Sequence, residues 1–338
     1  MNYKKQKKYE NVLLIAKHIC LQFLNFRIVN INGYLPKNMS KIYKAISTVI
    51  LVLSINFSFG QSSVLRPQIA EIAKSARGIV GVAVLGLEDR DTVSYNGNAR
   101  LVMESVLKFP VAMAVLHLVD SGVMTLNQTI HIKKKDLPKT YSPLRDKYPD
   151  GDVDVSIDDL LKYMVSQSDN DACDILLAKL GGPDQVNFYL RMIKMKGINI
   201  QASEEDMAKT PESQYTNWCR PKAMVHLLDT LYTGGVLKPD SRDYLIKLLD
   251  ETSTGPNRIK GLLPAGTIVG HKTGTSGAND ASIALGTNDV GVITLPNGKH
   301  VAIAIFVTNS TADEATRDLV IARIAKAVYD NQLLKKYK

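Results

Sequence analysis

The sequence predicts an α+β protein in which an α/β sandwich, built on an antiparallel sheet, is joined to an all-helical domain. Two observations predict this fold class. Stretches rich in β-forming residues occur before residue 103 and again after residue 251, near the two ends of the chain. The residues between them have the apolar spacing of helices. Strands from both ends can therefore share one sheet, covered by the first and last helices, with the helical segment inserted as a second domain.

The predicted elements follow this order along the chain. Residues 65–76 have helical spacing, residues 78–86 are β-rich, and residues 91–95 with Asn96-Gly97 are typical of a strand and turn. Helices are predicted over 108–121, 157–164, 171–180, 186–196, 222–232 and 241–249, strands over 269–274, 290–295 and 301–307, and a last helix over 312–330. We expect residues 61–103 and 251–338 to form the sandwich domain and residues 104–250 the all-helical domain.

The positive charge of the chain is concentrated at its N-terminus. The net charge is +9, but residues 1–60 hold nine Lys and Arg against one acidic residue, which gives +8 and leaves +1 for the rest. A nucleic-acid-binding protein would keep a basic surface on its folded body. We therefore expect no nucleic-acid partner.

Residues 1–60, called the leader below, have the pattern of a secretion signal. Two lysines precede an apolar run over residues 45–57, and the small-x-small triplet Ser58-Phe59-Gly60 predicts cleavage before Gln61. Met39 would itself start an ordinary signal, so we expect it to be the true start. The alternative is an uncleaved anchor, although the run is short for a membrane span. After removal of the signal we expect no membrane association.

Cysteine and histidine usage argues against a metal site. Cys20 lies in the leader, and Cys173 and Cys219 either pair in an oxidising compartment or act as small buried hydrophobic residues. Neither has metal-ligand spacing, and the six histidines are scattered, which disfavours a zinc hydrolase. We expect no metal or other cofactor.

Three short motifs carry the chemistry: Ser105-Val-Leu-Lys108, Ser168-Asp169-Asn170 and Lys272-Thr273-Gly274. Each is weak alone, but the three occur together in an order that suits one reaction. An activated serine needs a nearby base, a proton relay to the leaving group and a cationic clamp for an anionic substrate.

Ser105 opens a predicted helix, and Lys108 lies one turn further on the same side. The free amides at a helix start can hold a developing oxyanion. A lysine becomes a base only when burial or a neighbouring cation lowers its pKa, and Lys272 can supply that cation. The alternative is a solvated serine at a helix start beside a surface lysine.

The second and third motifs also have two readings. Ser-Asp-Asn is a favourable sequence for a turn and a helix N-cap, so its role can be purely structural. In the catalytic interpretation, Ser168 is a proton shuttle and the Asn170 side-chain amide orients the substrate. Lys-Thr-Gly is either a polar edge strand or a strand facing a cleft, where Gly274 permits close approach and the Thr275 N–H donates to the oxyanion. In the second reading Lys272 and Thr273 suit a substrate carboxylate.

Over residues 61–330 the sequence resembles class A serine β-lactamases, whose motif set these three motifs match. The resemblance implies the serine β-lactamase and penicillin-binding-protein-like transpeptidase fold. Penicillin-binding proteins share the three motifs, so a fourth element must discriminate. That element is a Glu on an Ω-loop, which activates the deacylating water.

The fourth element has the family pattern E-x-x-L-N, and the candidate here is Ser203-Glu204-Glu205-Asp206-Met207-Ala208. Counting back from Pro221, which opens the next helix as in the family, with Met207 in the Leu position, selects Glu204 over Glu205. Ala208 stands in the Asn position, so one usual partner of the hydrolytic water is missing. The alternative is a solvated acidic loop.

Further details resemble the cephalosporinase and extended-spectrum branch of class A, among them the run from His271 to Gly277. Thr275 and Ser276 suggest cephalosporins. Many family members carry an Arg just beyond the Lys-Thr-Gly strand, and this sequence has none there. We expect Arg258 to replace it and to bind the substrate carboxylate. The alternative is that Arg258 is a cation on a loop surface. Tyr141 matches the aromatic residue that lies at the mouth of the family's active site. The alternative is that its ring only packs against other side chains.

The resemblance implies a periplasmic, monomeric β-lactamase that gives antibiotic resistance by hydrolysing cephalosporins and penicillins through a Ser105 acyl-enzyme. Either Lys108 or Glu204 serves as the base in acylation. Ser168 delivers a proton to the departing ring nitrogen, and Glu204 activates water for deacylation. The alternatives are a penicillin-binding D,D-peptidase, which needs no Ω-loop Glu, and a β-lactam sensor domain that stays acylated.

Overall fold

The computed structural model describes residues 64–334. The predicted secretion signal, the start at Met39 and the cleavage site before Gln61 lie outside the described residues. Within residues 64–334, no helix is long and apolar enough to cross a membrane.

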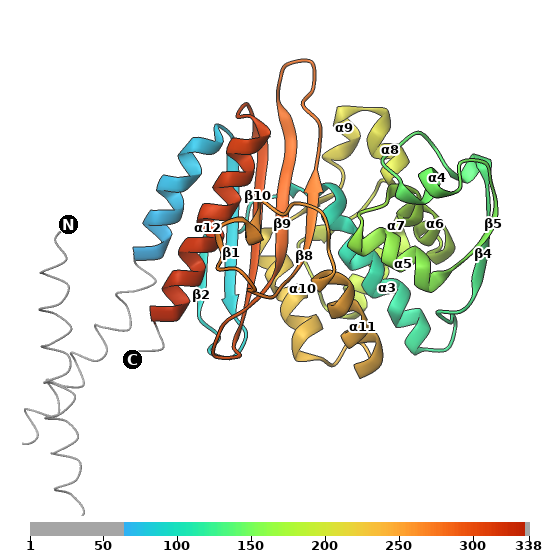
Figure 1. The fold of residues 1–338 in the computed structure, drawn as a ribbon, viewed down its shortest axis with the longest axis horizontal. Helices are drawn as coiled ribbons and strands as arrows, with labels where there is room; N and C mark the ends of the chain where they lie inside the picture. Colours follow the sequence, from blue (N-terminus) through green and yellow to red (C-terminus); the bar gives the residue numbers. More distant parts are fainter. Residues whose placement is uncertain (1–63, 335–338) are drawn as a thin grey trace, which may run out of the picture. The chain divides into compact units, whose positions relative to one another are not determined.

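The centre of the fold is a five-stranded antiparallel sheet with the order β2-β1-β10-β9-β8 (Figure 1). Its strands are β1 (Ile79–Gly86), β2 (Thr92–Tyr95), β8 (Val269–Thr275), β9 (Ala284–Thr294) and β10 (His300–Ser310). The first strand lies beside the last, with Val82 opposite Ile305. The predicted α+β fold, with a sheet shared by both ends of the chain, is confirmed.

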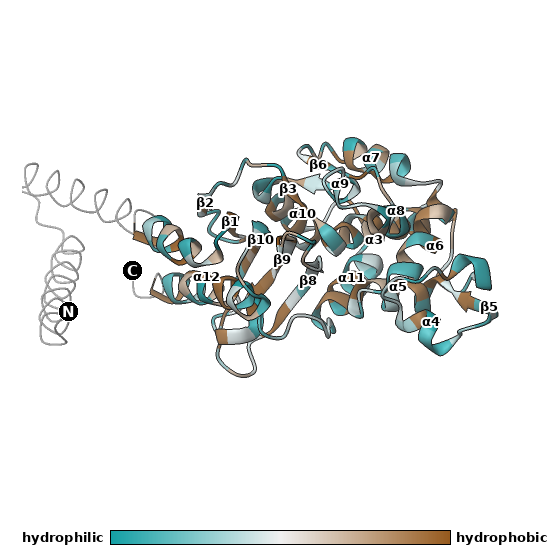
Figure 2. Cartoon of the chain, turned by 90° about the horizontal axis from the view of Figure 1, so that it is seen from above, coloured by the Kyte–Doolittle hydropathy of each residue, from teal (hydrophilic) through white to brown (hydrophobic). Residues whose placement is uncertain are grey.

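The two faces of the sheet belong to two hydrophobic clusters because side chains alternate along each strand. On β1, Val82 and Val84 pack with helix α12 (Glu314–Leu334), whereas Ala83 and Leu85 pack with the helical segment. Helical residues 64–73 and α12 lie together on one side of the sheet in Figure 1. Figure 2 shows hydrophilic and hydrophobic residues mixed along α12, as expected for a helix with one face on the sheet.

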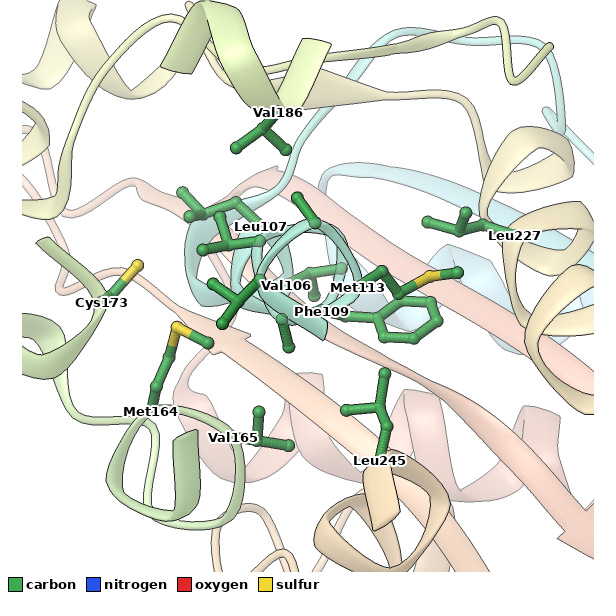
Figure 3. Packing of buried hydrophobic residues seen from close by; sticks show 14 of the residues in the cluster. Val106, Leu107, Phe109, Met113, Met164, Val165, Cys173, Val186, Leu227 and Leu245 are labelled. Atoms are coloured by element: carbon green, nitrogen blue, oxygen red, sulfur yellow. The ribbon is translucent and has the colours of Figure 1, made fainter. Parts of the chain in front are cut away.

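Helix α3 (Lys108–Asp120) is the centre of the helical segment. Its residues from Lys108 to Leu116 are all buried, so it is apolar on every side, as a core helix must be. Figure 3 shows side chains from the surrounding helices converging on Phe109 and Met113. These helices are α5 (Ile157–Ser166), α6 (Asn170–Leu180), α7 (Pro183–Met192), α10 (Pro221–Thr233) and α11 (Pro239–Asp250).

Several short elements complete the fold, and the strands among them were not predicted from the sequence. The middle of the chain also contains the antiparallel pair β4 (Thr129–Lys133) and β5 (Gly151–Ser156), so it is not purely helical. The remaining short elements are β3 (Leu101–Val102), β6 (Ile198–Asn199), β7 (Trp218–Cys219), α4 (Pro143–Lys147), α8 (Glu204–Lys209), α9 (Pro211–Gln214) and the 3₁₀ turns η1 (Lys74–Ala76), η2 (Glu104–Leu107), η3 (Lys134–Asp136) and η4 (Ile259–Leu262). The division into two domains stays a prediction.

The two cysteines of the described chain are both free and buried, Cys173 in α6 and Cys219 in β7. Of the two readings left open by the sequence, the structure therefore has buried thiols and no disulfide.

The burial of α3 predicts a large stability difference between two phenylalanines. Phe109 is 0% exposed and Phe188, on α7, is 58% exposed. Phe109→Ala should lower the free energy of unfolding by about 3–5 kcal/mol, because it removes a core ring and leaves a cavity. Phe188→Ala is the matched control and should change stability by no more than about 0.5 kcal/mol. Urea denaturation measures both, and equal losses would contradict the assignment of α3 as the core helix.

Candidate active site

Ser105 lies in the 3₁₀ turn η2, which leads directly into α3. The turn begins at Glu104, whose φ of +47° bends the backbone sharply before Ser105. The Nζ of Lys108, one turn further on, donates to Ser105 Oγ at 2.9 Å. Ser105 Oγ in turn donates to Glu204 Oε1 at 3.3 Å. The serine hydroxyl therefore lies between an amine and a carboxylate.

Lys108 has no exposed surface, and its ammonium is surrounded by oxygen atoms. Besides Ser105 Oγ, the Nζ contacts Ser168 O at 2.8 Å, Asn170 Oδ1 at 2.6 Å and Glu204 Oε1 at 2.8 Å. A buried charge is tolerated when it is paired and hydrogen-bonded in this way. Lys108 thus joins the first motif to the second motif and to the acidic loop.

The second motif combines both of its sequence readings. Asp169 is the buried N-cap of α6 and accepts from Ala172 N at 2.8 Å, from Leu144 N at 2.6 Å and from Ser142 Oγ. Burial raises the pKa of its carboxyl. Because Asp169 does the capping, Ser168 and Asn170 on either side are left to contact the two lysines. The backbone oxygen of the exposed Tyr141 accepts from Asn170 N at 3.0 Å.

The third motif lies on β8, an edge strand of the sheet. Lys272 is fully buried and donates to Ser168 Oγ at 2.8 Å and to Thr273 O at 2.9 Å. Burial, and after it the cation of Lys108, hold the pKa of Lys272 well below its ordinary value. A Cβ on Gly274 would lie 2.5 Å from Met103 O and 3.2 Å from Ser105 N, so only glycine lets β8 approach the serine this closely.

Glu204 is buried at the start of α8, whereas Glu205 is exposed. Ser203 caps this helix, and the carboxylate of Asp174 accepts from Glu204 N and Glu205 N, each at 2.8 Å. Burial raises the pKa of Asp174 to about 7. The side chain of Met207 is buried and that of Ala208 is exposed. The loop therefore directs Glu204, and not Glu205, to Ser105 and Lys108.

Arg258 and Ser276 lie differently from the expectation of direct contact with a substrate. The guanidinium of Arg258 is buried, pairs with Asp318 at 2.7 Å and donates to Thr275 Oγ1 at 2.8 Å. It also donates to the backbone oxygens of Gly274 and Asn288, each at 3.1 Å. The guanidinium is therefore engaged with four protein partners, one of which is Thr275. The Ser276 hydroxyl accepts from Gly286 N at 2.9 Å and so serves the sheet.

Three residues that hold the site were given no role in it from the sequence: Asp174 and Asn217, which lie in segments that resemble the extended-spectrum branch, and Thr254. Asp174 could have been found, because it stands one helical turn after Asn170 on the same face of α6. Asn217 is distant in sequence from every motif, and Thr254, whose hydroxyl lies 2.5 Å from that of Thr273, follows no pattern. Within residues 64–334, no group of three or more His, Cys, Asp or Glu side chains could hold a metal ion.

Asn217 is the buried anchor of the loop that carries Glu204. Its Oδ1 accepts from Gln201 N at 2.7 Å and from Ala202 N at 3.0 Å, and its Nδ2 donates to Ala202 O at 2.9 Å. Its backbone oxygen accepts from Met103 N at 3.0 Å, which ties the loop to the segment before Ser105. One side chain therefore closes the base of the loop.

The fold and this group of side chains define an enzyme of the serine hydrolase class. A family model described as the β-lactamase enzyme family matches residues 64–332. The chain is 42% identical to β-lactamase VEB-1 of Pseudomonas aeruginosa, over 87% of this chain and 100% of the relative. Extended-spectrum β-lactamase PER-1 of Pseudomonas aeruginosa is 38% identical, over 88% of this chain and 98% of the relative.

Solved structures agree with the sequence relatives. A β-lactamase from Chitinophaga pinensis matches with a TM-score of 0.78 and 46% identity, over 79% of this chain and 99% of that one. The TLA-1 extended-spectrum β-lactamase matches with a TM-score of 0.79 and 45% identity, over 80% and 99%. The chain therefore belongs to the β-lactamase enzyme family, as a class A serine β-lactamase, and the resemblance noted in the sequence is confirmed.

The hydrogen bonds of Asn217 predict that its loss loosens one loop. Asn217→Ala leaves the amides of Gln201 and Ala202 without their acceptor and should lower the free energy of unfolding by about 1–3 kcal/mol. Hydrogen exchange should accelerate in residues 200–217 and stay unchanged in β8–β10. Asn297→Ala, in the exposed turn before β10, is the matched control. Uniform acceleration over the whole chain would show that Asn217 does not act locally.

Proposed function

We propose that this enzyme hydrolyses the amide bond of β-lactam antibiotics through an acyl-enzyme on Ser105. The observation that carries the proposal is the position of Ser105 Oγ, which hydrogen-bonds both Lys108 Nζ and Glu204 Oε1. A nucleophile needs a group that accepts its proton, and the later hydrolysis of its ester needs a group that activates water. Both groups lie within hydrogen-bond distance of the same hydroxyl.

In the acylation step, Ser105 Oγ attacks the β-lactam carbonyl and loses its proton. In the arrangement described here Lys108 donates to Ser105 Oγ while Ser105 donates to Glu204, which supports Glu204 as the proton acceptor. The backbone N–H groups of Ser105 and Thr275 stabilise the oxyanion. Collapse of the tetrahedral intermediate breaks the C–N bond, and the ring nitrogen takes a proton from Ser168, whose hydroxyl accepts from Lys272. The proton that Glu204 took from Ser105 is passed on to restore the Ser168 hydroxyl, so that Glu204 is again a carboxylate before deacylation.

In the deacylation step, Glu204 removes a proton from a water molecule, which attacks the ester carbon, and Ser105 regains its proton as it leaves. Ala208 offers no amide to hold this water. Its placement therefore falls to Glu204, whose main-chain N–H is fixed by Asp174.

Substrate binding is proposed for the polar groups around Ser105. Asn170 and Tyr141 come from the helical segment, and Thr273, Gly274 and Thr275 from β8. Thr273 and Lys272 suit a carboxylate on the substrate, and Arg258 supports that side of the site through Thr275.

We propose cephalosporins together with penicillins as substrates, and the relatives PER-1 and TLA-1, named extended-spectrum β-lactamases, support a broad range of β-lactams. We propose resistance to these antibiotics as the role. Export by the leader, a periplasmic location and a monomeric state complete the proposal.

Replacement of Glu204 should separate the two steps, because Lys108 Nζ lies 2.9 Å from Ser105 Oγ and can take the serine proton when Glu204 is absent. Glu204→Ala should slow hydrolysis of the ester by about 10²–10⁴-fold, because it removes the base that activates water. Intact-mass spectrometry after addition of a chromogenic cephalosporin to residues 61–338 should then show a lasting adduct on the variant and little on the wild type. Glu205→Ala, on the exposed neighbour, is the control and should behave like the wild type.

Ser105→Gly should form no adduct at all. A persistent adduct on the wild type would contradict the proposal and favour the D,D-peptidase or the sensor domain.

A further inference from the structure

Glu104, directly before Ser105, is a buried carboxyl group that the proposed reaction does not use. Its side chain is 6% exposed, and its Oε1 is buried with no hydrogen-bond partner. Gly286 on β9 makes room for it, since a Cβ there would lie 2.6 Å from Glu104 Cγ and 3.1 Å from Oε1. A Cβ on Gly274 would lie 3.0 Å from the Cβ of Glu104. The side chain is therefore packed against the glycines of β8 and β9.

No cation neutralises this carboxyl group. Among the described residues Glu104 forms no ion pair, and the charged groups that act on it are Glu204, which repels a carboxylate, and Lys108, which attracts one. Lys108 is already paired with Glu204 at 2.8 Å. The other charged groups of the elements around it are engaged elsewhere: Lys272 with Ser168, Asp289 with His271, and Arg258 with Asp318. A carboxylate at Glu104 would be both desolvated and repelled.

A second unsatisfied acceptor lies in the same region. Asn288 Nδ2 donates to Val102 O and Met103 O, which leaves its Oδ1 buried without a partner. A Cβ placed on Gly286 would lie 3.1 Å from Glu104 Oε1 and 3.3 Å from Asn288 Nδ2, so both side chains reach the space that this glycine leaves open. A protonated Glu104 carboxyl has one O–H donor, whereas a carboxylate has acceptors only, in a region that already holds the unpartnered Asn288 Oδ1.

We propose that Glu104 is a neutral carboxylic acid in the working enzyme and that it is a positioning residue for the oxyanion-binding backbone beside it. The inference rests on the proposed function of Ser105. Glu104 acts through its neighbour: its strained backbone aims the Ser105 N–H, and its retained proton keeps negative charge away from the place where the oxyanion develops. Burial and, after it, the charge of Glu204 raise the pKa of Glu104 to about 8, which agrees with this assignment.

The proposal predicts an alkaline loss of activity that belongs to Glu104. Above pH 8 the carboxyl ionises, and a carboxylate next to the oxyanion should oppose the transition state. Between pH 7 and pH 9 the kcat/KM of the wild type should fall about tenfold more than that of Glu104→Gln, because about one tenth of the carboxyl groups keep their proton one unit above the pKa. Glu205→Gln, an exposed carboxyl, is the control and should follow the wild type. Glu104→Met, which also cannot ionise, serves if the Gln variant does not fold.

The pH dependence of stability is a second test of whether Glu104 keeps its proton. The folded protein keeps the proton from the ordinary pKa of 4.5 up to about 8, whereas the unfolded chain loses it, so the wild type loses stability as the pH rises through this window. The difference in Tm between Glu104→Gln and the wild type should therefore shift in favour of the variant from pH 5 to pH 8. Above pH 8 this difference should stay constant.

A measurement independent of activity distinguishes the two proposals. Infrared spectra of the Ser105→Gly single variant and the Ser105→Gly, Glu104→Gln double variant should differ at neutral pH by one protonated-carboxyl band. The single variant should show this band, and the band should disappear above pH 8. Absence of that band, or an alkaline loss that Glu104→Gln leaves in place, would overturn the inference. Hydrolysis that persists in Ser105→Gly would instead overturn the proposed function, while the band would still decide the state of Glu104.

Discussion

The buried ammonium of Lys108 is the interaction on which the rest of the site depends. A lysine without access to water is stable only when its charge is compensated and its N–H groups have acceptors. Here the acceptors come from three separate segments: Ser105 from the turn η2, Ser168 and Asn170 from the turn before α6 and its first residue, and Glu204 from α8. Moving any segment would leave a buried charge unbalanced, so the three are held in one arrangement.

A second lysine connects this arrangement to the sheet. Lys272 on β8 is also fully buried, but its partners are a hydroxyl and a carbonyl oxygen, with no carboxylate among them. Burial and the nearby Lys108 charge therefore make the neutral amine easier to form at Lys272 than at an ordinary lysine. Because its hydroxyl partner is Ser168, the sheet and the helical segment meet at the residue proposed to pass a proton to the leaving group.

Two carboxyl groups near Ser105 show how the environment separates chemical roles. Glu204 is 2.8 Å from the Lys108 ammonium, and Asp174 and Asn217 hold the loop that carries it. Glu104 is buried without a cation against the glycines of two strands. Groups of one chemical type in different environments are suited to different tasks. We propose the first carboxyl group as the base and the second as the one that keeps its proton.

Local information in the sequence was enough for the order of elements, the shared sheet and the three motifs, because periodicity and motif spacing depend on neighbours in the chain. The resemblance to class A β-lactamases, through the family pattern E-x-x-L-N, selected Glu204 over Glu205. Local information could not show the hairpin of β4 and β5 or the buried polar half of β9 from Ala284 to Asp289, where the residues lack a strand's apolar pattern. Only the tertiary structure decided that Arg258 is committed to Asp318 and Thr275, that Asn217 closes the loop and that Glu104 has no partner. Those facts depend on contacts between distant segments, and burial and pairing exist only after the chain has folded.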